Sequence, residues 1–244
     1  MQLLVLVFWF CLTITIIATA AATTNTNNIA KPGCQTKCGN VTISYPFGIG
    51  PNCSINPWFD ITCNTSFSPP KPFYGSRELY NVTNSTFRMG NTVASRCYDQ
   101  YGNITENIFA YTKMGNESPF TFSPLNKFTL ISCSDLTIFS DPDQFTTGCL
   151  SLCSSPDDVI GDGSCSGGGC CQTSVVKGLK YYFTMTMSRT YGRDRSAIWK
   201  FNPCTYSFMG EPERFTFRGA SDLIDPNFKT RVMATVPILM DWVR

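Results

Sequence analysis

Residues 38–53 read CGNVTISYPFGIGPNC, a short strand and two turns enclosed between cysteines. Val41, Ile43 and Tyr45 alternate with polar residues, which predicts that their side chains face one side of a β-strand. Pro46 cannot donate to a strand ladder, and the glycines that follow it permit tight turns. The segment contains no acidic, basic or imidazole side chain, so we interpret it as an architectural element.

The same kind of pattern recurs along the chain. Short runs of β-branched and aromatic residues alternate with Gly, Pro, Asn and Ser, whereas helical periodicity is scarce. The sequence therefore predicts a mainly β, disulfide-rich fold with little helix. Further strands are expected at residues 58–63, 128–133, 181–188 and 214–218, and helices only around residues 197–201 or within the last twenty residues.

The charge composition excludes several classes of protein. The 244 residues include 19 Lys and Arg against 17 Asp and Glu, a net charge of +2, and no histidine. A nucleic-acid binder would carry a strongly basic surface, so no nucleic acid is expected as a partner. The absence of histidine excludes Ser-His and Cys-His catalysis and imidazole zinc sites.

The N-terminus indicates export. Residues 3–17 form an apolar run, small residues follow at 18–22, and no charged residue precedes Lys31. This pattern predicts a signal peptide at residues 1–22 and a flexible spacer at residues 23–30. The alternative is an uncleaved anchor helix, because the apolar stretch is just long enough to span a bilayer.

The cysteines indicate an oxidising compartment. Of thirteen, Cys11 lies in the expected signal peptide, and an even number in an exported chain predicts six disulfides. Cys170 and Cys171 are adjacent, so each is expected to pair with a separate distant partner. The spacings and the missing histidines argue against a metal site, and no cofactor is expected. The expected disulfide cysteines are Cys34, Cys38, Cys53, Cys63, Cys97, Cys133, Cys149, Cys153, Cys165, Cys170, Cys171 and Cys204.

Sequons for asparagine-linked glycans mark exposed positions in an exported protein. They are confined to the first half of the chain, which predicts a glycan-coated first module and a barer second one. Asn81 and Asn84 are close enough to crowd one another. The sequons start at Asn40, Asn52, Asn64, Asn81, Asn84, Asn103 and Asn116.

Two small β modules are expected, with a boundary near residues 141–143. Residues 31–140 contain eight Lys and Arg against six Asp and Glu, a net charge of +2. Residues 141–244 contain eleven of each and are neutral. Six disulfides would compensate for two modest cores, because each contributes about 2–4 kcal/mol.

Few residues suggest chemistry. Gly161 and Gly163 lie in a Gly-rich loop without the Lys-Ser/Thr of a phosphate-binding loop, so a turn-rich disulfide loop is favoured. Asp157, Asp158 and Asp162 lack the spacing of a calcium loop, and a solvated loop is favoured. A glycosidase needs two carboxylates, but no acidic pair stands out. We therefore expect no catalytic residue and no metal ligand.

Basic residues interspersed with aromatic residues are the best binding candidates. Cations bond carboxylates and aromatic rings offer flat faces to sugars, which would suit an acidic polysaccharide. The alternative is that they are ordinary solvated charges beside a buried aromatic core. The candidate ligand-binding residues are Lys71, Arg77, Arg88, Arg96, Lys113, Tyr74 and Tyr98. A second basic group comprises Lys177, Lys180, Arg189, Arg193, Arg195 and Lys200.

The opening segment also carries a family resemblance. Its pattern C-G-N-V-x-I-x-Y-P-F-G-I-G at residues 38–50 closely resembles the extracellular galacturonan-binding region of plant wall-associated receptor kinases. The resemblance runs over most of residues 33–243. Other stretches that carry it are FDITCN at 59–64, CY at 97–98, GCCQT at 169–173, KGL at 177–179, NPCTY at 202–206 and VPILMDW at 236–242.

This resemblance implies a galacturonan-binding-like cysteine-rich domain at residues 31–140 and the associated C-terminal cysteine-rich domain at residues 141–244. It implies non-catalytic binding of pectin at the cell wall, with plasma-membrane anchoring if the natural product continues beyond Arg244. In such receptors EGF-like repeats, a membrane helix and a kinase follow; none is in this sequence, so no enzyme activity is expected. The alternative is a secreted co-receptor or decoy that contacts other receptor ectodomains without binding sugar.

Overall fold

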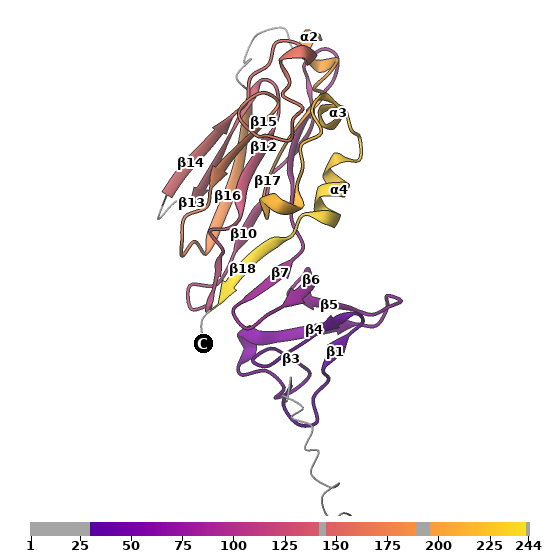
Figure 1. The fold of residues 1–244 in the computed structure, drawn as a ribbon, viewed down its shortest axis with the longest axis vertical. Coiled ribbons are helices and arrows are strands. Elements are labelled where there is room, and N and C mark those ends of the chain that lie inside the picture. The colour runs from indigo at the N-terminus through magenta and orange to yellow at the C-terminus, as the bar shows by residue number, and fades with distance from the viewer. Residues whose placement is uncertain (1–29, 142–144, 189–195, 243–244) are drawn as a thin grey trace, which may run out of the picture.

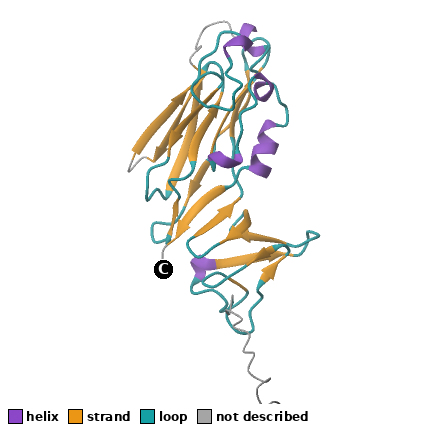
Figure 2. Cartoon of the chain, in the orientation of Figure 1, coloured by secondary structure: helices purple, strands orange, loops and turns teal. Residues whose placement is uncertain are grey.

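The computed structural model describes residues 30–141, 145–188 and 196–242. The expected signal peptide at residues 1–22, and residues 23–29 of the expected spacer, lie outside this range. The described part is mainly β (Figure 2). Within it, no helix is both long enough and apolar enough to cross a membrane.

The described strands form four sheets, in which the one parallel pairing joins β3 to β4. A ribbon pairs β1 (Lys37–Cys38) with β2 (Val41–Thr42). The seven-stranded sheet has the order β11 (Phe120–Phe122), β18 (Ile238–Trp242), β7 (Thr86–Met89), β6 (Arg77–Val82), β5 (Lys71–Tyr74), β4 (Asp60–Asn64) and β3 (Gly48–Ile49).

The other two sheets lie in the upper part of Figure 1. The four-stranded sheet has the order β10 (Tyr111–Lys113), β16 (Tyr181–Ser188), β13 (Asp135–Asp141) and β14 (Phe145–Leu150). The five-stranded sheet has the order β15 (Cys170–Ser174), β12 (Lys127–Ile131), β17 (Cys204–Gly210), β8 (Ala94–Tyr98) and β9 (Ile104–Ile108).

Helices are few and short. The α-helices are α2 (Ser196–Trp199), α3 (Ala220–Leu223) and α4 (Phe228–Thr235). Single 3₁₀ turns occur at Pro57–Phe59, Pro156–Asp158 and Pro212–Arg214. In Figure 1, α3 and α4 lie on the side of the five-stranded sheet that faces away from the four-stranded sheet. β18, β7 and β6 connect these upper layers to the lower part, which carries β1 and β3 to β5.

The expected boundary near residues 141–143 does not separate two independent sheets. Three of the four described sheets combine strands from both sides of residue 141. β13, for example, precedes this point and pairs with β14 and β16, which follow it. The physical reason is that a strand in mid-sheet needs backbone partners on both edges, and here the later half of the chain supplies them.

An aromatic cluster explains the opening Y-P-F-G segment. Phe47 is fully buried, its ring stacks on Phe120 at 5.8 Å, and it meets Phe59 edge-on at 5.0 Å. Trp242, from the end of the described chain, packs edge-on against Phe47 at 5.8 Å. Through these contacts Phe47 joins the lower part to the strands above it. Such aromatic pairs contribute about 0.5–1.5 kcal/mol beyond their burial.

A second cluster lies under the helices. Phe228 and Val232, four residues apart on one face of α4, are both buried. Phe228 stacks on Tyr206 of β17 at 4.9 Å, and Phe215 contacts Phe208 edge-on at 5.2 Å. The five-stranded sheet is therefore covered by α4 on this face, which positions the helix next to β6.

The expected six disulfides are present. They pair Cys34 with Cys53, Cys38 with Cys63, Cys97 with Cys204, Cys133 with Cys153, Cys149 with Cys171, and Cys165 with Cys170. Adjacent Cys170 and Cys171 have separate partners, as expected. The expectation that both partners are distant is wrong for Cys170, which closes a tight loop with Cys165 five residues away.

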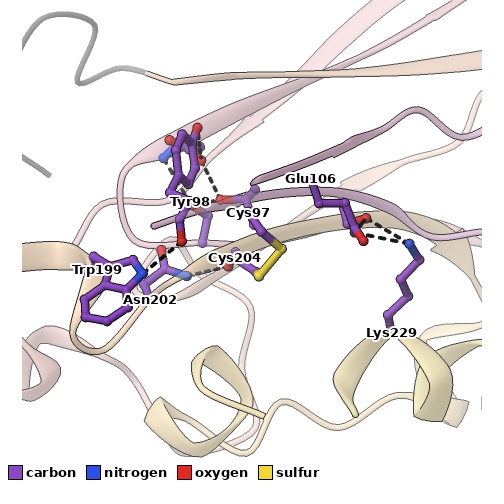
Figure 3. Close-up of a disulfide and its surroundings, with 11 residues drawn as sticks. Cys97, Tyr98, Glu106, Trp199, Asn202, Cys204 and Lys229 are labelled. Carbon is purple, nitrogen blue, oxygen red and sulfur yellow. Dashed lines mark hydrogen bonds and ion pairs between the residues drawn. A yellow bond between two sulfur atoms is a disulfide. The ribbon is translucent and has the colours of Figure 1, made fainter. Parts of the chain in front are cut away.

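The disulfide between Cys97 and Cys204 joins directly opposite positions of β8 and β17 (Figure 3). Hydrogen bonds connect the residues around this disulfide. The indole nitrogen of Trp199 donates to the carbonyl oxygen of Tyr98 at 2.8 Å. The amide of Asn202 donates to the carbonyl oxygen of Cys204 at 2.6 Å. The short helix α2, which contains Trp199, is thereby attached to the end of β8 in the five-stranded sheet.

Most of the expected strands are confirmed. β4 and β12 overlap the expected ranges 58–63 and 128–133, and β16 matches residues 181–188. Helix forms at α2 and α4 as expected, but α3 lies outside both regions in which helix was expected. The strand expected at residues 41–45 shortens to β2.

The strand expected at residues 214–218 is wrong. Phe215 and Phe217 alternate inward and are buried, but this segment follows a 3₁₀ turn and pairs with no described strand. Its apolar alternation reflects packing beneath the helices, which period-two patterns cannot distinguish from sheet pairing.

Candidate functional site

A hollow of about 480 Å³ lies between β6 and α4. One wall is formed by β6 and the segment after β7, and the other by the outer face of α4. Its lining residues are Ser76, Arg77, Glu78, Tyr80, Gly90, Asn91, Thr92, Thr230, Met233 and Ala234. The hollow exists because α4 packs on the five-stranded sheet while β6 belongs to the seven-stranded one.

Two further hollows adjoin it. One of about 360 Å³ shares Tyr80 and Ala234 and is completed by Asn81, Arg88, Arg214, Thr235 and Pro237. The other, of about 200 Å³, shares Ser76 and Arg77 and is completed by Trp58, Tyr74, Gly75, Met89, Thr112, Lys113, Met114 and Gly115. Because neighbouring hollows share lining residues, we treat the three as one surface feature and call these lining residues the β6 groove.

A β-bulge shapes the middle of this groove. Leu79 pairs with Met89, but the pairing then skips to Asn81 opposite Arg88, so that Tyr80 is the extra residue. Leu79 is buried and Val82 packs against the same core. Because Leu79 and Val82 both face inward, the bulge lets Tyr80 and Asn81 both face outward. Tyr80 and Asn81 therefore lie side by side on the groove.

Arg77 is positioned at the junction of two hollows. Its guanidinium donates to the carbonyl oxygen of Gly90 at 3.1 Å, to Oγ1 of Thr92 at 3.2 Å and to Oγ1 of Thr112 at 2.6 Å. These acceptors are neutral, so they orient the group without cancelling its charge. Arg77 thus joins β6 to β10 and leaves a positive charge at the centre of the groove.

Arg88 is engaged differently. Its Nε donates to Oε2 of Glu211 at 2.7 Å, and its Nη2 donates to Oε1 of the same carboxylate at 2.8 Å. These hydrogen bonds raise the pKa of Arg88 above its usual value. The pair places a fixed cation in the groove, but one whose charge is already balanced.

Two other cations of the groove are exposed. Among the described residues, neither Arg214 nor Lys113 has a carboxylate within ion-pair distance. The ammonium of Lys113 lies 5.9 Å from the ring centre of Tyr181. With Arg77, these residues bring three positive charges to the groove from β6, β10 and the turn before Phe215, and none of the three forms an ion pair with a described carboxylate.

Aromatic rings lie beside these cations. Trp58 is 37% exposed, and Gly115 packs so closely on its ring that a Cβ added there would lie 2.5 Å from Cη2. Tyr74 also lines the groove, and burial raises its pKa to about 12, so it stays neutral over the physiological range. The groove therefore combines positive charge with aromatic side chains.

The structure brings together four of the seven candidate ligand-binding residues. Arg77, Arg88, Lys113 and Tyr74 line the β6 groove. Lys71 is close to it, since its ammonium forms an ion pair at 2.9 Å with Glu78, a lining residue.

The other two candidates lie elsewhere. Arg96 and Tyr98 are on β8 and line none of the three hollows. The guanidinium of Arg96 donates to the carbonyl oxygen of Thr186 at 3.0 Å, while the Tyr98 side chain is buried and donates to Asp135 at 3.4 Å.

Sequence reasoning did not select Tyr80, Arg214 or Trp58 as ligand contacts, nor any residue of α4. Tyr80 becomes outward-facing through the bulge, and α4 contributes only because it folds back beside β6. The Asn-Pro-Trp-Phe run before β4 was the available signal for Trp58, because Pro57 opens a 3₁₀ turn that presents the ring. Arg214 carries no comparable local signal.

Of the second basic group, the described residues Lys177, Lys180 and Lys200 line none of the three hollows. Lys180 donates to the carbonyl oxygens of Asn116 and Ser118, both at 2.7 Å, whereas Lys177 and Lys200 are exposed. Arg189, Arg193 and Arg195 lie outside the described residues.

The acidic loop is internally bonded. Asp158 accepts from the backbone nitrogens of Ser154 and Ser155 at 2.7 and 2.9 Å, and Asp162 accepts from that of Ser164 at 2.8 Å. Within the described ranges, no group of three or more Cys, Asp or Glu residues is arranged to hold a metal ion.

Comparisons with known proteins find similar sequences in one group of plant proteins. Residues 34–100 match the family described as wall-associated receptor kinase galacturonan-binding. Among proteins of Arabidopsis thaliana, the chain is 37% identical over 214 residues to wall-associated receptor kinase 2, 36% over 220 residues to wall-associated receptor kinase 5, and 35% over 222 residues to wall-associated receptor kinase 1. No solved structure matches.

These alignments cover 86%, 87% and 87% of this chain but 27%, 28% and 28% of the respective relatives. The chain therefore spans roughly a quarter of the length of the curated relatives it matches. The similarity extends well beyond residues 34–100.

Proposed function

Since the chain is a relative of the wall-associated receptor kinases and carries their galacturonan-binding domain at residues 34–100, we propose that it binds acidic cell-wall polysaccharide outside the cell, without catalysing a reaction. The ligand class is pectin with free carboxylates, or the oligogalacturonides derived from it. The β6 groove is the proposed site.

The observation that carries this proposal is the set of three cations that have no carboxylate partner among the described residues. Arg77, Lys113 and Arg214 come from separate elements and line one open surface. The carboxylates of a galacturonan chain would supply the missing partners through charge-assisted hydrogen bonds. Trp58 and Tyr80 offer ring faces on which a sugar ring can pack.

The dimensions of the groove favour an extended polymer. β6 alone contains six residues and extends over about 20 Å. Two of the hollows lie along β6, and the third continues past Arg77 to Tyr74. Exposed ion pairs contribute only about 0.2–1 kcal/mol each, so a single sugar would bind weakly. A chain with repeated carboxylates engages several positions at once and rebinds before it diffuses away, which raises the overall affinity.

The direct test is retention on immobilised polygalacturonate at increasing salt, with fully methyl-esterified pectin as the uncharged comparison. The screening length falls from about 10 Å at 0.1 M salt to about 3 Å at 1 M, so retention should be lost across this range. Retention that is indifferent to salt and to esterification would contradict the proposal.

Variants then locate the site. Arg214→Ala and Lys113→Ala should each weaken binding by up to about fivefold, and the double variant by the product of the two effects. Lys177→Ala removes the same charge from an exposed position outside the groove and should bind as the wild type does. If all three variants weaken retention equally, net charge and not the groove is responsible. If the wild type does not bind, the alternative of a protein-interaction ectodomain is favoured.

A further inference from the structure

Asn81 combines a glycosylation sequon with a position inside the β6 groove. The sequence Asn81-Val82-Thr83 is a sequon, and Asn81 lines the same hollow as Arg88 and Arg214. Asparagine-linked glycans extend from the atom to which they are attached, so a glycan on Asn81 would begin within the hollow. The position of this sequon is set by the bulge, which turns Asn81 outward beside Tyr80.

The Asn81 side chain is available for modification. It is exposed, and its amide forms no hydrogen bond to another described residue. Asn103, another sequon asparagine, differs because its amide nitrogen donates to Asp99 at 2.9 Å.

We propose that a glycan on Asn81 covers the Arg88–Arg214 end of the β6 groove and thereby limits the length of acidic polysaccharide that the groove can hold. This inference rests on the proposed function. The hollow at Asn81 has a volume of about 360 Å³, so the first sugars of a glycan would fill much of its space. The effect is steric, because these sugars are uncharged.

The other end of the groove would remain open. Trp58, Arg77 and Lys113 line hollows in which Asn81 takes no part. A short oligogalacturonide would therefore bind to glycosylated and unglycosylated protein alike. A longer one would reach Arg214 only when Asn81 is bare, so occupancy of one sequon would select among ligand lengths.

Asn84 provides a matched control. Its sequon, Asn84-Ser85-Thr86, lies only three residues away in the turn between β6 and β7, and Asn84 is exposed. It lines none of the three hollows. Asn84→Gln therefore removes a neighbouring glycan without opening the groove.

The experiment uses the full chain secreted from plant cells, with peptide mass mapping of Asn81 and Asn84. Binding of oligogalacturonides of graded length is compared among wild type, Asn81→Gln and Asn84→Gln. Asn81→Gln should bind long oligomers several-fold more tightly and short ones equally, while Asn84→Gln should match the wild type. An unmodified Asn81 in the mapped protein, or an unchanged length dependence in Asn81→Gln, overturns the inference.

A second readout requires no sugar ligand. Arginine-selective diketone labelling of Arg214 should be slower in the glycosylated wild type than in Asn81→Gln, by several-fold. Slower labelling of Arg214 in the wild type, in a protein that binds no polygalacturonate, would refute the proposed function but support the placement of the glycan. Equal labelling together with normal polygalacturonate binding would refute the glycan placement and retain the function.

Discussion

Arg88 and Glu211, which lie 123 positions apart in the chain, meet in a two-pronged ion pair with donor–acceptor distances of 2.7 and 2.8 Å. The pair connects β7 of the seven-stranded sheet to the turn that follows β17 of the five-stranded sheet. It also balances the charge of Arg88. The neighbouring Arg77 and Arg214 form no ion pair with a described carboxylate.

Glu211→Gln should therefore have two opposite effects. The free energy of unfolding should fall by about 1–3 kcal/mol, because Arg88 loses a charge-assisted partner. Polygalacturonate affinity should rise, because Arg88 then carries an unbalanced charge. Urea unfolding and retention on the polymer measure the two effects. Glu213→Gln, at an exposed neighbouring position, is the control for stability. A fall in both quantities would mean that the ion pair serves to shape the groove.

Gly115→Ala should displace the ring of Trp58. An added Cβ would lie 2.5 Å from this ring, which is exposed enough to move outward. We expect greater acrylamide quenching of tryptophan fluorescence and weaker polymer binding, with a change in stability below about 1 kcal/mol. At Gly148 the nearest atom would be 3.4 Å from the new Cβ, so Gly148→Ala should leave quenching and binding unchanged. Unaltered quenching in Gly115→Ala would contradict the contact.

Polygalacturonate binding should be nearly constant between pH 5 and 8. The chain has no histidine, and lysine and arginine keep their charges over this range. Tyr74, with a pKa of about 12, also stays neutral. Sugar carboxyl groups titrate near the α-carboxyl range of about 3.5, so binding should decrease as the pH falls below about 4. A step in affinity near pH 6.5 would contradict this assignment of the groups.

Glu106 should contribute to acid sensitivity. A hydrogen bond from Ser95, together with Lys229 at 3.3 Å, lowers the pKa of Glu106 (Figure 3). A lowered pKa stabilises the fold above the unfolded value of about 4.3, and this contribution is lost as the pH falls through the folded value. Because the carboxylate is 40% exposed, the contribution should stay below about 1 kcal/mol.

The test compares urea unfolding at pH 5.5 and pH 3. Between these values, Glu106→Gln should lose less stability than the wild type does. An equal loss in both proteins would show that Glu106 does not contribute to the pH dependence.

The disulfides should differ in their effect on stability. Cys97 and Cys204 are separated by 107 positions, against five for Cys165 and Cys170. Loop-closure entropy predicts that replacing the first pair by serine costs about 5 kcal/mol, and replacing the second about 2 kcal/mol. Thermal unfolding of the two double-serine variants measures this order. The reverse order would indicate that native contacts outweigh the entropy of the unfolded chain.

Local patterns were sufficient for much of the fold. The alternation at residues 181–188 predicted β16 with its observed bounds, because apolar side chains on a half-buried strand must recur every second residue. The same alternation failed at Phe215 and Phe217, which are buried without pairing to a described strand. Alternation of this kind indicates that one side of a segment is buried, but the backbone partner of the segment depends on which other segments lie alongside it.

The candidate site was predicted only in part. Arg77 and Lys113 were selected because basic residues are interspersed with aromatic ones near them. Arg96 fits the same local pattern, yet it lies on another sheet and donates to Thr186. The orientation of Tyr80 depends on a bulge, and pairing shifts of this kind leave no clear mark in the sequence.

Composition and short-range pattern by themselves determined the chemical class of this protein: a cysteine-rich, mainly β chain without histidine, and hence without imidazole chemistry. These properties are additive or local, so a linear sequence displays them directly. The tertiary structure alone decided which cysteines pair, which strands share a sheet, and that Arg214 and α4 complete a groove begun by β6. Such contacts join distant positions, and they form only where buried surface and paired backbone groups compensate for the entropy of closing long loops.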